Sequence, residues 1–467
     1  MNRYQGALAS LTAMAALAAY GPDILRAILK IKLPKFFSFR AEEQNSIEIG
    51  KYKLSDEDRL RHTHVVGATG SGKTVLMETI IYEDIARGQG MLIIDPKGDR
   101  DLYLRIKKFC ESIGRENDLH LISGSHPADS VRWNPCRLGS PTEIQSKLLN
   151  AWTFTEAFYQ KACEALLLRA LNDIDAEKEF SLADLMSELK RLAGKDENGQ
   201  ALFLDIFNLI SGEYGEILCS SSPQKTKREI SLLEVVRKNE ILFLDLPVEG
   251  KSYQSERLGK MILQEMLLIS GLRKIFPELR GPLPFSVFVD EFDAFATKSF
   301  VTFLNKGRSS KFMIHIFHQT LSDIAKDELG GINYQRQILG NINARFVFRQ
   351  DIPEDAETWA SFFGTESTQK VTHRTEGGSL TGSGSLRETR EFSIHPDRIK
   401  SLAVGECIIS VKSQKILDQI SLELPNPKKH INQRFVFRKE YSTQSKKPEL
   451  ERLVSEYKKV KKEEIVL

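Results

Sequence analysis

The sequence predicts an α/β protein built on a mostly parallel, doubly wound sheet, with an all-helical domain inserted into it. Short apolar runs that end in polar or glycine-rich turns alternate with longer helical stretches, which is the pattern of strands covered by helices. The runs are nearly continuous in Val, Ile, Leu, Met and Phe, as parallel strands buried on both faces should be. The expected strands are 64–66, 91–94, 241–244, 285–289, 313–317 and 345–348.

The core domain is expected to be discontinuous in sequence. About 145 residues separate the strands at 91–94 and 241–244, and the middle of this gap is rich in helix formers without a convincing strand. We therefore expect an N-terminal segment, a first part of the core domain, an all-α domain, a second part of the core domain and a basic C-terminal tail. Their expected ranges are 1–40, 41–140, 141–235, 236–424 and 425–467.

Composition indicates a folded protein with reduced cysteines. The chain has 467 residues, 41% hydrophobic and 28% charged, which excludes collagen-like, wholly disordered and polytopic membrane classes. Its formal net charge of +3 is too small to demand a nucleic-acid partner by itself. The tail has twelve basic and six acidic residues from 428 onward, a run more often solvated than bound to a partner. Five scattered cysteines without a CxxC pair favour neither a disulfide framework nor a zinc site.

Two further segments have a distinctive composition. The apolar run 7–20 has about 14 residues, whereas a membrane-spanning helix needs about 20. The stretch 24–39 mixes apolar and basic residues, as a helix at a membrane surface would. A membrane tether and a helix packed on the body, or disordered, both stay open. The glycine- and serine-rich run 377–385 predicts a mobile loop between two extended segments.

The strongest motif is a phosphate-binding loop, GATGSGKT, between the strand at 64–66 and a helical stretch. Glycines let backbone N–H groups turn inward around a phosphate, and the following helix adds the positive end of its dipole. Lys73 is expected to reach the β- and γ-phosphates and Thr74 to hold Mg²⁺, so ATP and Mg²⁺ are the expected cofactors. The alternative is a decayed site that only binds. The expected nucleotide contacts are Gly67, Ala68, Thr69, Gly70, Ser71, Gly72, Lys73, Thr74 and Val75.

Hydrolysis also requires a carboxylate that organises the metal and a group that orients water. Asp290 and Glu291 follow the strand at 285–289, at the carboxyl end where doubly wound sheets assemble ligand sites. Neighbouring strand positions face opposite sides, so Asp290 is expected at the Mg²⁺ and Glu291 at the attacking water. Asp95 and Asp245 also end expected strands, and we interpret them as strand-end turns rather than catalytic groups.

Two further catalytic contributions are expected from polar residues near other strand ends. Gln319 follows the strand at 313–317 and is positioned to sense the γ-phosphate or orient water, although a hydrogen bond that finishes the strand is the alternative. An arginine from a neighbouring subunit would stabilise the transition state, although each arginine taken singly is more often a surface or ion-pair residue. The arginines near the expected strand ends are Arg308, Arg336, Arg345 and Arg349, and spacing alone does not select one of them. Our catalytic candidates are Arg345 and Arg349.

These motifs, in this order, resemble the type IV coupling proteins, the TraD/TraG-like ATPases of bacterial conjugation within the RecA-like group of DNA pumps. The likeness covers most of residues 55–420 and includes an inserted all-α domain after Trp133-Asn134-Pro135. The matching segments are HTHVVGATGSGKT, IIDPKGD, WNP, ILFLDLP, VFVDEFDAF, GRSSKFMIHIFHQTLSDI, NINARFVF and FGT.

The resemblance implies an ATP-hydrolysing, hexameric ring at the cytoplasmic face of the bacterial inner membrane. It also implies that the ring links single-stranded, relaxase-bound DNA to a type IV secretion channel. Such proteins usually carry two clear N-terminal transmembrane helices, whereas this chain offers at most one candidate, at 7–20. The competing hypotheses are a related secretion or assembly ATPase that does not bind DNA, and a non-hydrolysing docking platform, which the pair Asp290-Glu291 disfavours.

Overall fold

The computed structural model describes most of the chain between residues 45 and 430. The described residues are 45–98, 100–152, 154, 156–174, 179–194, 197–218, 228–250, 252–281, 283–376 and 379–430. The segments 7–20 and 24–39, Cys219 and the tail beyond 430 lie outside them. The chain divides into two units between residues 46 and 47, and the fold below is that of the second unit. In the described part of the chain, no helix combines the length and the apolar character needed to cross a bilayer.

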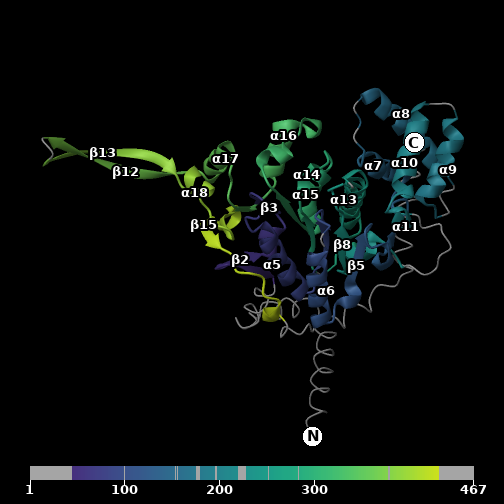
Figure 1. Ribbon diagram of the computed structural model, residues 1–467, viewed down its shortest axis with the longest axis horizontal. Helices are drawn as coiled ribbons and strands as arrows, with labels where there is room; N and C mark the ends of the chain where they lie inside the picture. The colour runs from purple at the N-terminus through teal and green to yellow at the C-terminus, as the bar shows by residue number, and fades with distance from the viewer. Residues whose placement is uncertain are drawn as a thin grey trace, which may run out of the picture. The chain divides into compact units, whose positions relative to one another are not determined.

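A mixed nine-stranded sheet forms the centre of the second unit (Figure 1). The strands from β11 to β5 run parallel, and β14 and β15 add two antiparallel strands at one edge. The expected α/β fold with a mostly parallel sheet is therefore confirmed. In sheet order the strands are β15 (Ile416–Ser421), β14 (Glu406–Val411), β11 (Ala344–Val347), β3 (Thr63–Val66), β10 (Phe312–His318), β9 (Phe285–Val289), β4 (Gly90–Asp95), β8 (Ile241–Asp245) and β5 (Leu119–Ser123).

All six expected strands are present, and each differs from its expected range by two residues at most. Three strands of the sheet were not expected, namely β5, β14 and β15. Of these, β5 and β15 are the two edge strands, where one side of the strand is unpaired and polar residues are tolerated, and β14 pairs with both β15 and β11. The sequence LHLIS of β5, for example, carries a histidine and a serine, so it lacks the continuous apolar run of a central strand.

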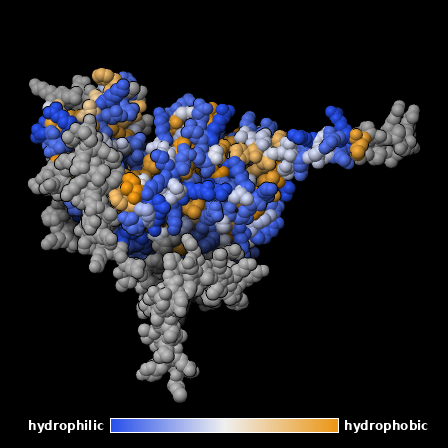
Figure 2. All heavy atoms as spheres, turned by 180° about the vertical axis from the view of Figure 1, so that it is seen from behind, coloured by the Kyte–Doolittle hydropathy of each residue, from blue (hydrophilic) through white to orange (hydrophobic). Residues whose placement is uncertain are grey.

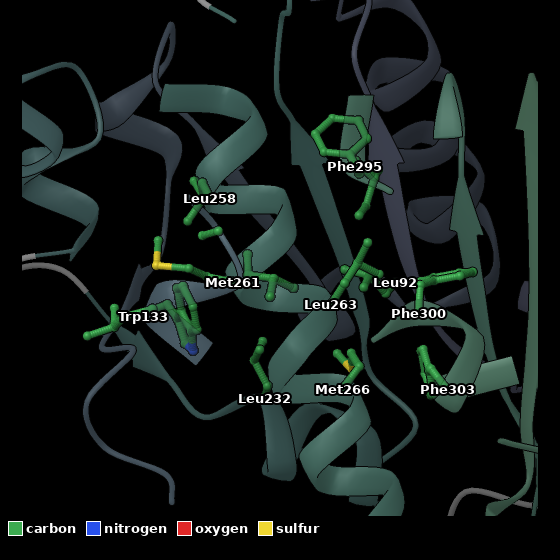
Figure 3. Packing of buried hydrophobic residues seen from close by; sticks show 14 of the residues in the cluster. Leu92, Trp133, Leu232, Leu258, Met261, Leu263, Met266, Phe295, Phe300 and Phe303 are labelled. Carbon is green, nitrogen blue, oxygen red and sulfur yellow. The ribbon is translucent and has the colours of Figure 1, made fainter. Parts of the chain in front are cut away.

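Helices cover both faces of the sheet because successive strand residues point to opposite sides. In β4, Met91 and Ile93 belong to a hydrophobic cluster with α5 (Lys73–Ala86) and α6 (Asp101–Ile113). Leu92 and Ile94 belong to a second cluster, which includes residues of α13 (Ser252–Ile275) and α15 (Phe300–Gly307). Figure 3 shows part of this second cluster, in which Leu258, Met261, Leu263 and Met266 of α13 pack between Trp133 and the phenylalanines Phe295, Phe300 and Phe303.

The segment between β6 and β7 is predominantly helical. Its helices are α7 (Pro141–Leu149), α8 (Ala157–Asp173), α9 (Leu182–Ala193), α10 (Glu197–Ser211) and α11 (Gly215–Leu218). The expected all-α range 141–235 also contains the two-residue strand β7 (Glu229–Ile230), which pairs with β6 (Arg132–Trp133) and returns the chain to the core. Figure 2 shows hydrophobic atoms among hydrophilic ones on these helices, and the exposed apolar side chains there include Phe158, Tyr159 and Leu204.

The Trp133-Asn134-Pro135 segment connects the helical insertion to the core. Lys147 of α7 forms a buried ion pair with Glu265 of α13, and its Nζ also donates to the carbonyl oxygen of Pro135 at 2.7 Å. Trp133 Nε1 donates to Glu265 Oε1 at 3.2 Å. A buried charge is tolerated only when it is paired and hydrogen-bonded, so this arrangement fixes α7 against α13 in one register.

The glycine-rich run 377–385 was expected to be a loop, and the structure corrects its extent. The strand β13 (Ser379–Phe392), which pairs with β12 (Thr365–Glu376) in an antiparallel hairpin, includes residues 379–385 of the run, and only residues 377 and 378 lie outside the described residues. The extended flanks are confirmed. Hydrogen bonds between β12 and β13 satisfy backbone N–H and C=O groups of this run, although its composition alone predicts a loop. The remaining described helices and strands are β1 (Ser46–Ile49), β2 (Tyr52–Ser55), α4 (Asp56–Arg59), α12 (Leu232–Arg237), α14 (Phe292–Phe295), α16 (Gly331–Gly340), α17 (Pro353–Phe363) and α18 (Pro396–Lys400).

Candidate nucleotide-binding site

The glycine-rich loop lies at the carboxyl end of β3 and leads directly into α5. Gly70 and Gly72 have φ angles of 73° and 116°, in the left-handed region that favours glycine. A Cβ atom on Gly67 would lie 2.4 Å from the Cβ of Phe348, so the close approach of these two segments also requires glycine at position 67. The N–H groups of the first turn of α5 have no partners within the helix, which makes this helix start suitable for phosphate.

Lys73 is folded back over its own loop. Its Nζ donates to the carbonyl oxygens of Gly67 at 2.6 Å and Ala68 at 3.1 Å. Burial lowers the pKa of Lys73, and the negative charge of Asp290 counteracts part of this effect. The ammonium group is therefore held at the loop by two carbonyls that a phosphate oxygen can replace.

Thr74 and Asp290 are brought together by a residue that sequence reasoning did not select. Lys97 Nζ lies 2.9 Å from Thr74 Oγ1 and 2.8 Å from Asp290 Oδ2, so one cation contacts both expected metal ligands. Burial alone would lower the pKa of Lys97, but the charge of Asp290 outweighs it and raises the pKa. A hydroxyl and a carboxylate oxygen are ligands that Mg²⁺ prefers, and the position of Lys97 Nζ shows that they can hold a cation between them. The residues present therefore fit Mg²⁺.

Glu291 follows Asp290 at the point where the chain turns from β9 into α14. Its φ of 41° places it in the left-handed region, as the residue that caps α14. The carboxyl group is half-buried. Its pKa is raised, mainly by burial and then by the negative charge of Asp290. A carboxyl group with a raised pKa accepts a proton more readily than an exposed one, which suits a group that orients and deprotonates water.

Gln319 is connected to the phosphate-binding loop. Thr69 Oγ1 donates to Gln319 Oε1 at 3.0 Å, and the backbone N–H of Gln319 donates to Asp323 Oδ2 at 3.0 Å. Burial would raise the pKa of Asp323, but hydrogen bonds from His318 and Thr320 outweigh burial and hold it below its usual range. Asp323 thus anchors the strand end that carries Gln319, and the amide lies within reach of the loop.

The two arginine candidates have different environments. Arg345 lies in β11 and is fully buried, with its guanidinium 4.4 Å from the centre of the Phe362 ring. Arg349 is partly exposed, its Nε lies 3.0 Å from Asp351 Oδ1, and its carbonyl oxygen accepts from the N–H of Ala68. Only Arg349 of these two is therefore brought to the phosphate-binding loop and to the surface.

The aspartates at two other strand ends have the expected structural contacts. Asp95 Oδ1 accepts from the backbone N–H of Lys97 at 3.1 Å, which fixes the turn that carries Lys97. Asp245 Oδ2 accepts from Ser123 Oγ at 2.6 Å, across the neighbouring strand β5. Two features of the sequence point to Lys97, namely its position two residues after the strand-ending Asp95 and its place in the matching segment IIDPKGD, and a turn explains both equally well.

A family model for the AAA-like domain matches residues 55–420. The chain belongs to the AAA-like domain family. The matched range contains the whole phosphate-binding loop, Asp290-Glu291 and Gln319, and it includes the helical insertion. These AAA-like motifs therefore lie within one matched region of the chain.

Among curated proteins, this AAA-like chain is 23% identical over 478 residues to the type 4 coupling protein DotL of Legionella pneumophila. The match covers 81% of this chain and 59% of the relative, so the chain spans little more than half of that protein's length. The expected resemblance to type IV coupling proteins is confirmed as distant similarity.

Solved structures show the same fold. The unbound bacterial conjugative coupling protein TrwB, without its first 70 residues, matches with a TM-score of 0.63 and 17% identity, over 82% of this chain and 89% of that one. TrwB in complex with ADP and Mg²⁺ matches with a TM-score of 0.59 and 16% identity, over 82% and 89%. VirB4 of Thermoanaerobacter pseudethanolicus matches with a TM-score of 0.56 and 12% identity, over 83% and 98%. The expected RecA-like architecture is thus confirmed.

Proposed function

We propose that this chain is an ATP-hydrolysing coupling protein of a type IV secretion or conjugation system. In this proposal it pumps DNA, single-stranded and bound to a relaxase, toward the secretion channel. The observation that carries the ATPase part is the contact of one ammonium group, Lys97 Nζ, with both Thr74 Oγ1 and Asp290 Oδ2. Two sequence segments more than 200 residues apart therefore meet at one cation-binding point.

The proposed reaction assigns one role to each residue of the site. Lys73 leaves the carbonyls of Gly67 and Ala68 and binds the β- and γ-phosphates. Thr74 and Asp290 would hold Mg²⁺, which neutralises charge on the phosphate oxygens when bound. Glu291 orients the attacking water and accepts its proton. Gln319, tied to Thr69, senses whether the γ-phosphate is present.

The DNA part of the proposal is supported by the similarity to coupling proteins. DotL and TrwB carry that name, and TrwB is described as a conjugative and a plasmid coupling protein. We extend the proposal to a hexameric ring at the cytoplasmic face of the inner membrane, in which relaxase and channel components are the partners. Arg349 is our candidate for the arginine that reaches a neighbouring nucleotide, because the guanidinium of Arg345 is enclosed within its own chain.

A second candidate function is a secretion-system ATPase that does not bind DNA. The similarity to VirB4 favours it, since that structure matches 98% of its own length. Both functions use the same ATPase site. They differ in whether nucleic acid changes the rate of hydrolysis.

The experiment compares ATP turnover of the full chain without DNA, with single-stranded DNA and with double-stranded DNA. We expect turnover that rises with single-stranded DNA and disappears in Lys73→Ala. The matched control Lys107→Ala removes an exposed lysine of α6 and should behave as the wild type. A rate that is indifferent to DNA would favour the second function. A wild-type protein without ATP turnover would contradict both functions.

A further inference from the structure

A pocket of about 430 Å³ opens at the amino-terminal ends of the parallel strands of the sheet. We call it the basic pocket. The residues that line it and are used below are Arg61, Arg308, Asn343, Lys412 and Ser413. The phosphate-binding loop follows the carboxyl end of β3, whereas Arg61 precedes the same strand. The basic pocket therefore lies at the amino-terminal ends of the parallel strands, whereas the nucleotide site lies at their carboxyl-terminal ends.

The topology brings these residues together from distant parts of the chain. Arg308 begins the short helix η4 (Arg308–Ser310), which precedes β10, and Lys412 begins η7 (Lys412–Gln414), which follows β14. Since β14 is antiparallel to β11, its carboxyl end lies at the amino-terminal edge of the parallel strands. Asn343 fixes the turn of Lys412, because it donates to Ser413 Oγ at 2.8 Å and accepts from Ser413 N–H at 3.0 Å.

The positive charge of the basic pocket is poorly balanced. No aspartate or glutamate is among its lining residues. Asp58 is one nearby acid, and its carboxylate oxygens accept hydrogen bonds from Ser413 Oγ and Gln414 Nε2. Glu57 is the other, and its Oε1 lies 3.5 Å from Nη2 of both Arg61 and Arg308. The carboxylate side chain is 72% exposed, so water and salt screen these contacts. Arg61 and Arg308 thus share one exposed carboxylate, and Lys412 adds a third positive charge to the lining of the basic pocket.

A buried cation behind the pocket adds to the imbalance. Within the described residues, Nε and Nη1 of Arg345 have no hydrogen-bond partner. Its guanidinium and the Nζ of Lys412 lie 4.4 and 5.1 Å from the centre of the same Phe362 ring. Burial, and then the charge of Arg345, lower the pKa of Lys412. A negatively charged ligand would relieve this repulsion.

Further basic residues lie beyond the lining of the basic pocket. Lys274 lies near the end of α13, and its pKa is lowered by burial and by the charges of Lys306 and Arg280. Lys306 lies in α15, two residues before Arg308. A group of several cations suits a polyanion better than a single small anion.

We infer that the basic pocket binds the phosphodiester backbone of a nucleic acid strand. Arginine forks match the geometry of phosphate oxygens, and lysine adds a point charge. Contacts of this kind position a strand without reading its sequence, as a pump for DNA of any sequence requires. The inference rests on the proposed function, and it adds a contact site for the DNA at the sheet edge opposite the ATP site.

The test uses the full chain and a fluorescently labelled single-stranded oligonucleotide of mixed sequence. The variant Arg61→Gln/Lys412→Gln removes two charges of the basic pocket. The control Lys161→Gln/Arg169→Gln removes one lysine and one arginine, both exposed, from α8. Anisotropy gives the affinity between about 0.05 and 0.2 M salt, where counterion release is measurable. ATP turnover without DNA, expected unchanged in both variants, checks that they are folded.

We expect the pocket variant to bind about tenfold more weakly, as the loss of two screened ion pairs implies. The slope of log K against log salt should become shallower by about 1.4, since each single-strand phosphate contact contributes about 0.7. The control should bind as the wild type.

Three outcomes would overturn the inference. If the pocket variant binds DNA as tightly as the wild type, the strand lies elsewhere, and the proposed function stands. If the wild type binds no single-stranded DNA, the inference and the DNA part of the proposed function both fail, and the wild-type arm alone shows this. If vesicles of anionic phospholipid bind through the two pocket residues and DNA does not, the ligand is a membrane surface.

Discussion

At the scale of single residues, the ammonium group of Lys97 has to move before the site can bind a metal ion. Its ammonium group lies between the two expected Mg²⁺ ligands, Thr74 and Asp290. A cation that binds both ligands has to displace it. Lys97 therefore both keeps the ligands together and competes with the metal ion.

The variant Lys97→Met should bind Mg²⁺·nucleotide at a Mg²⁺ concentration about threefold to fivefold lower than the wild type. The reason is that a competing, partly exposed ion pair worth up to about 1 kcal/mol is removed. The measurement is the binding of a fluorescent ADP analogue at varied Mg²⁺, with Lys107→Met as the matched control. A higher Mg²⁺ requirement in Lys97→Met would show instead that Lys97 assists binding.

The raised pKa of Glu291 predicts how hydrolysis depends on pH. The carboxylate form is needed to accept a proton, and burial together with Asp290 raises the pKa above the ordinary value of 4.5. We expect kcat to fall with decreasing pH through a pKa above 4.5, and this acid limb to be absent from the residual turnover of Glu291→Gln. Asp293→Asn, which changes the neighbouring carboxylate, should retain the limb. An acid limb that persists in Glu291→Gln would assign it to another group.

The residues with a strict motif could be predicted from the sequence, and those defined by a contact could not. The spacing of the phosphate-binding loop selects Lys73 and Thr74, and the doublet at a strand end selects Asp290. Lys97 escapes prediction because a lysine in a turn gives no sign of where its long side chain reaches. The burial of Arg345 escapes for a related reason, since an arginine within a short apolar run is compatible with either face of the sheet.

At the scale of elements, α5 is anchored to the sheet by a buried ion network. Arg59 donates to both carboxylate oxygens of Asp84 at 2.7 and 2.6 Å, Arg87 donates to it at 2.9 Å, and Ser286 of β9 donates at 2.8 Å. Burial alone would raise the pKa of Asp84, but the charges of Arg59 and then Arg87 outweigh it and hold the pKa well below 3.8. The helix that presents the phosphate-binding loop is therefore held by Asp84.

The variant Asp84→Asn should lower the free energy of unfolding by about 3 kcal/mol, because it removes one of the two buried carboxylates, Asp84 and Asp56, that pair with Arg59 and Arg87. Denaturant unfolding at neutral pH measures this change. The stabilisation is present above the ordinary aspartate pKa of 3.8 and is lost as the pH falls toward the lower folded value, so the difference between variant and wild type should shrink there. Glu188→Gln, on the surface of α9, is the control and should leave the midpoint unchanged.

The elements that were predicted correctly are those with a single strong signal. Continuous apolar runs gave the six central strands, and helix formers indicated the insertion. The edge strands β5 and β15 have mixed sequences and are defined by their pairing with β8 and β14, and β14 itself pairs with both β15 and β11. The hairpin β12–β13 was mistaken in part for a loop because glycine and serine weaken a strand locally, whereas the paired flanks extend it.

At the scale of the whole described unit, one sheet carries two sites at opposite ends of its parallel strands. The nucleotide site uses the carboxyl ends of β3, β9 and β10, and the basic pocket uses the amino end of β3 and the carboxyl end of β14. Because Arg308 precedes β10 and Gln319 follows it, the two strands β3 and β10 connect the place of ATP hydrolysis with the proposed place of DNA contact. The sequence predicted the first site because a motif defines it, and not the second because distant loops build it.

The measurement that tests the central claim most directly is the identity of the nucleotide bound after incubation with Mg²⁺·ATP. The account predicts that the wild type yields ADP, whereas Glu291→Gln binds equally well and yields uncleaved ATP, with hydrolysis slowed by about 10²–10⁴-fold. Recovery of ADP from Glu291→Gln at the wild-type rate would contradict the assignment of hydrolysis to this site.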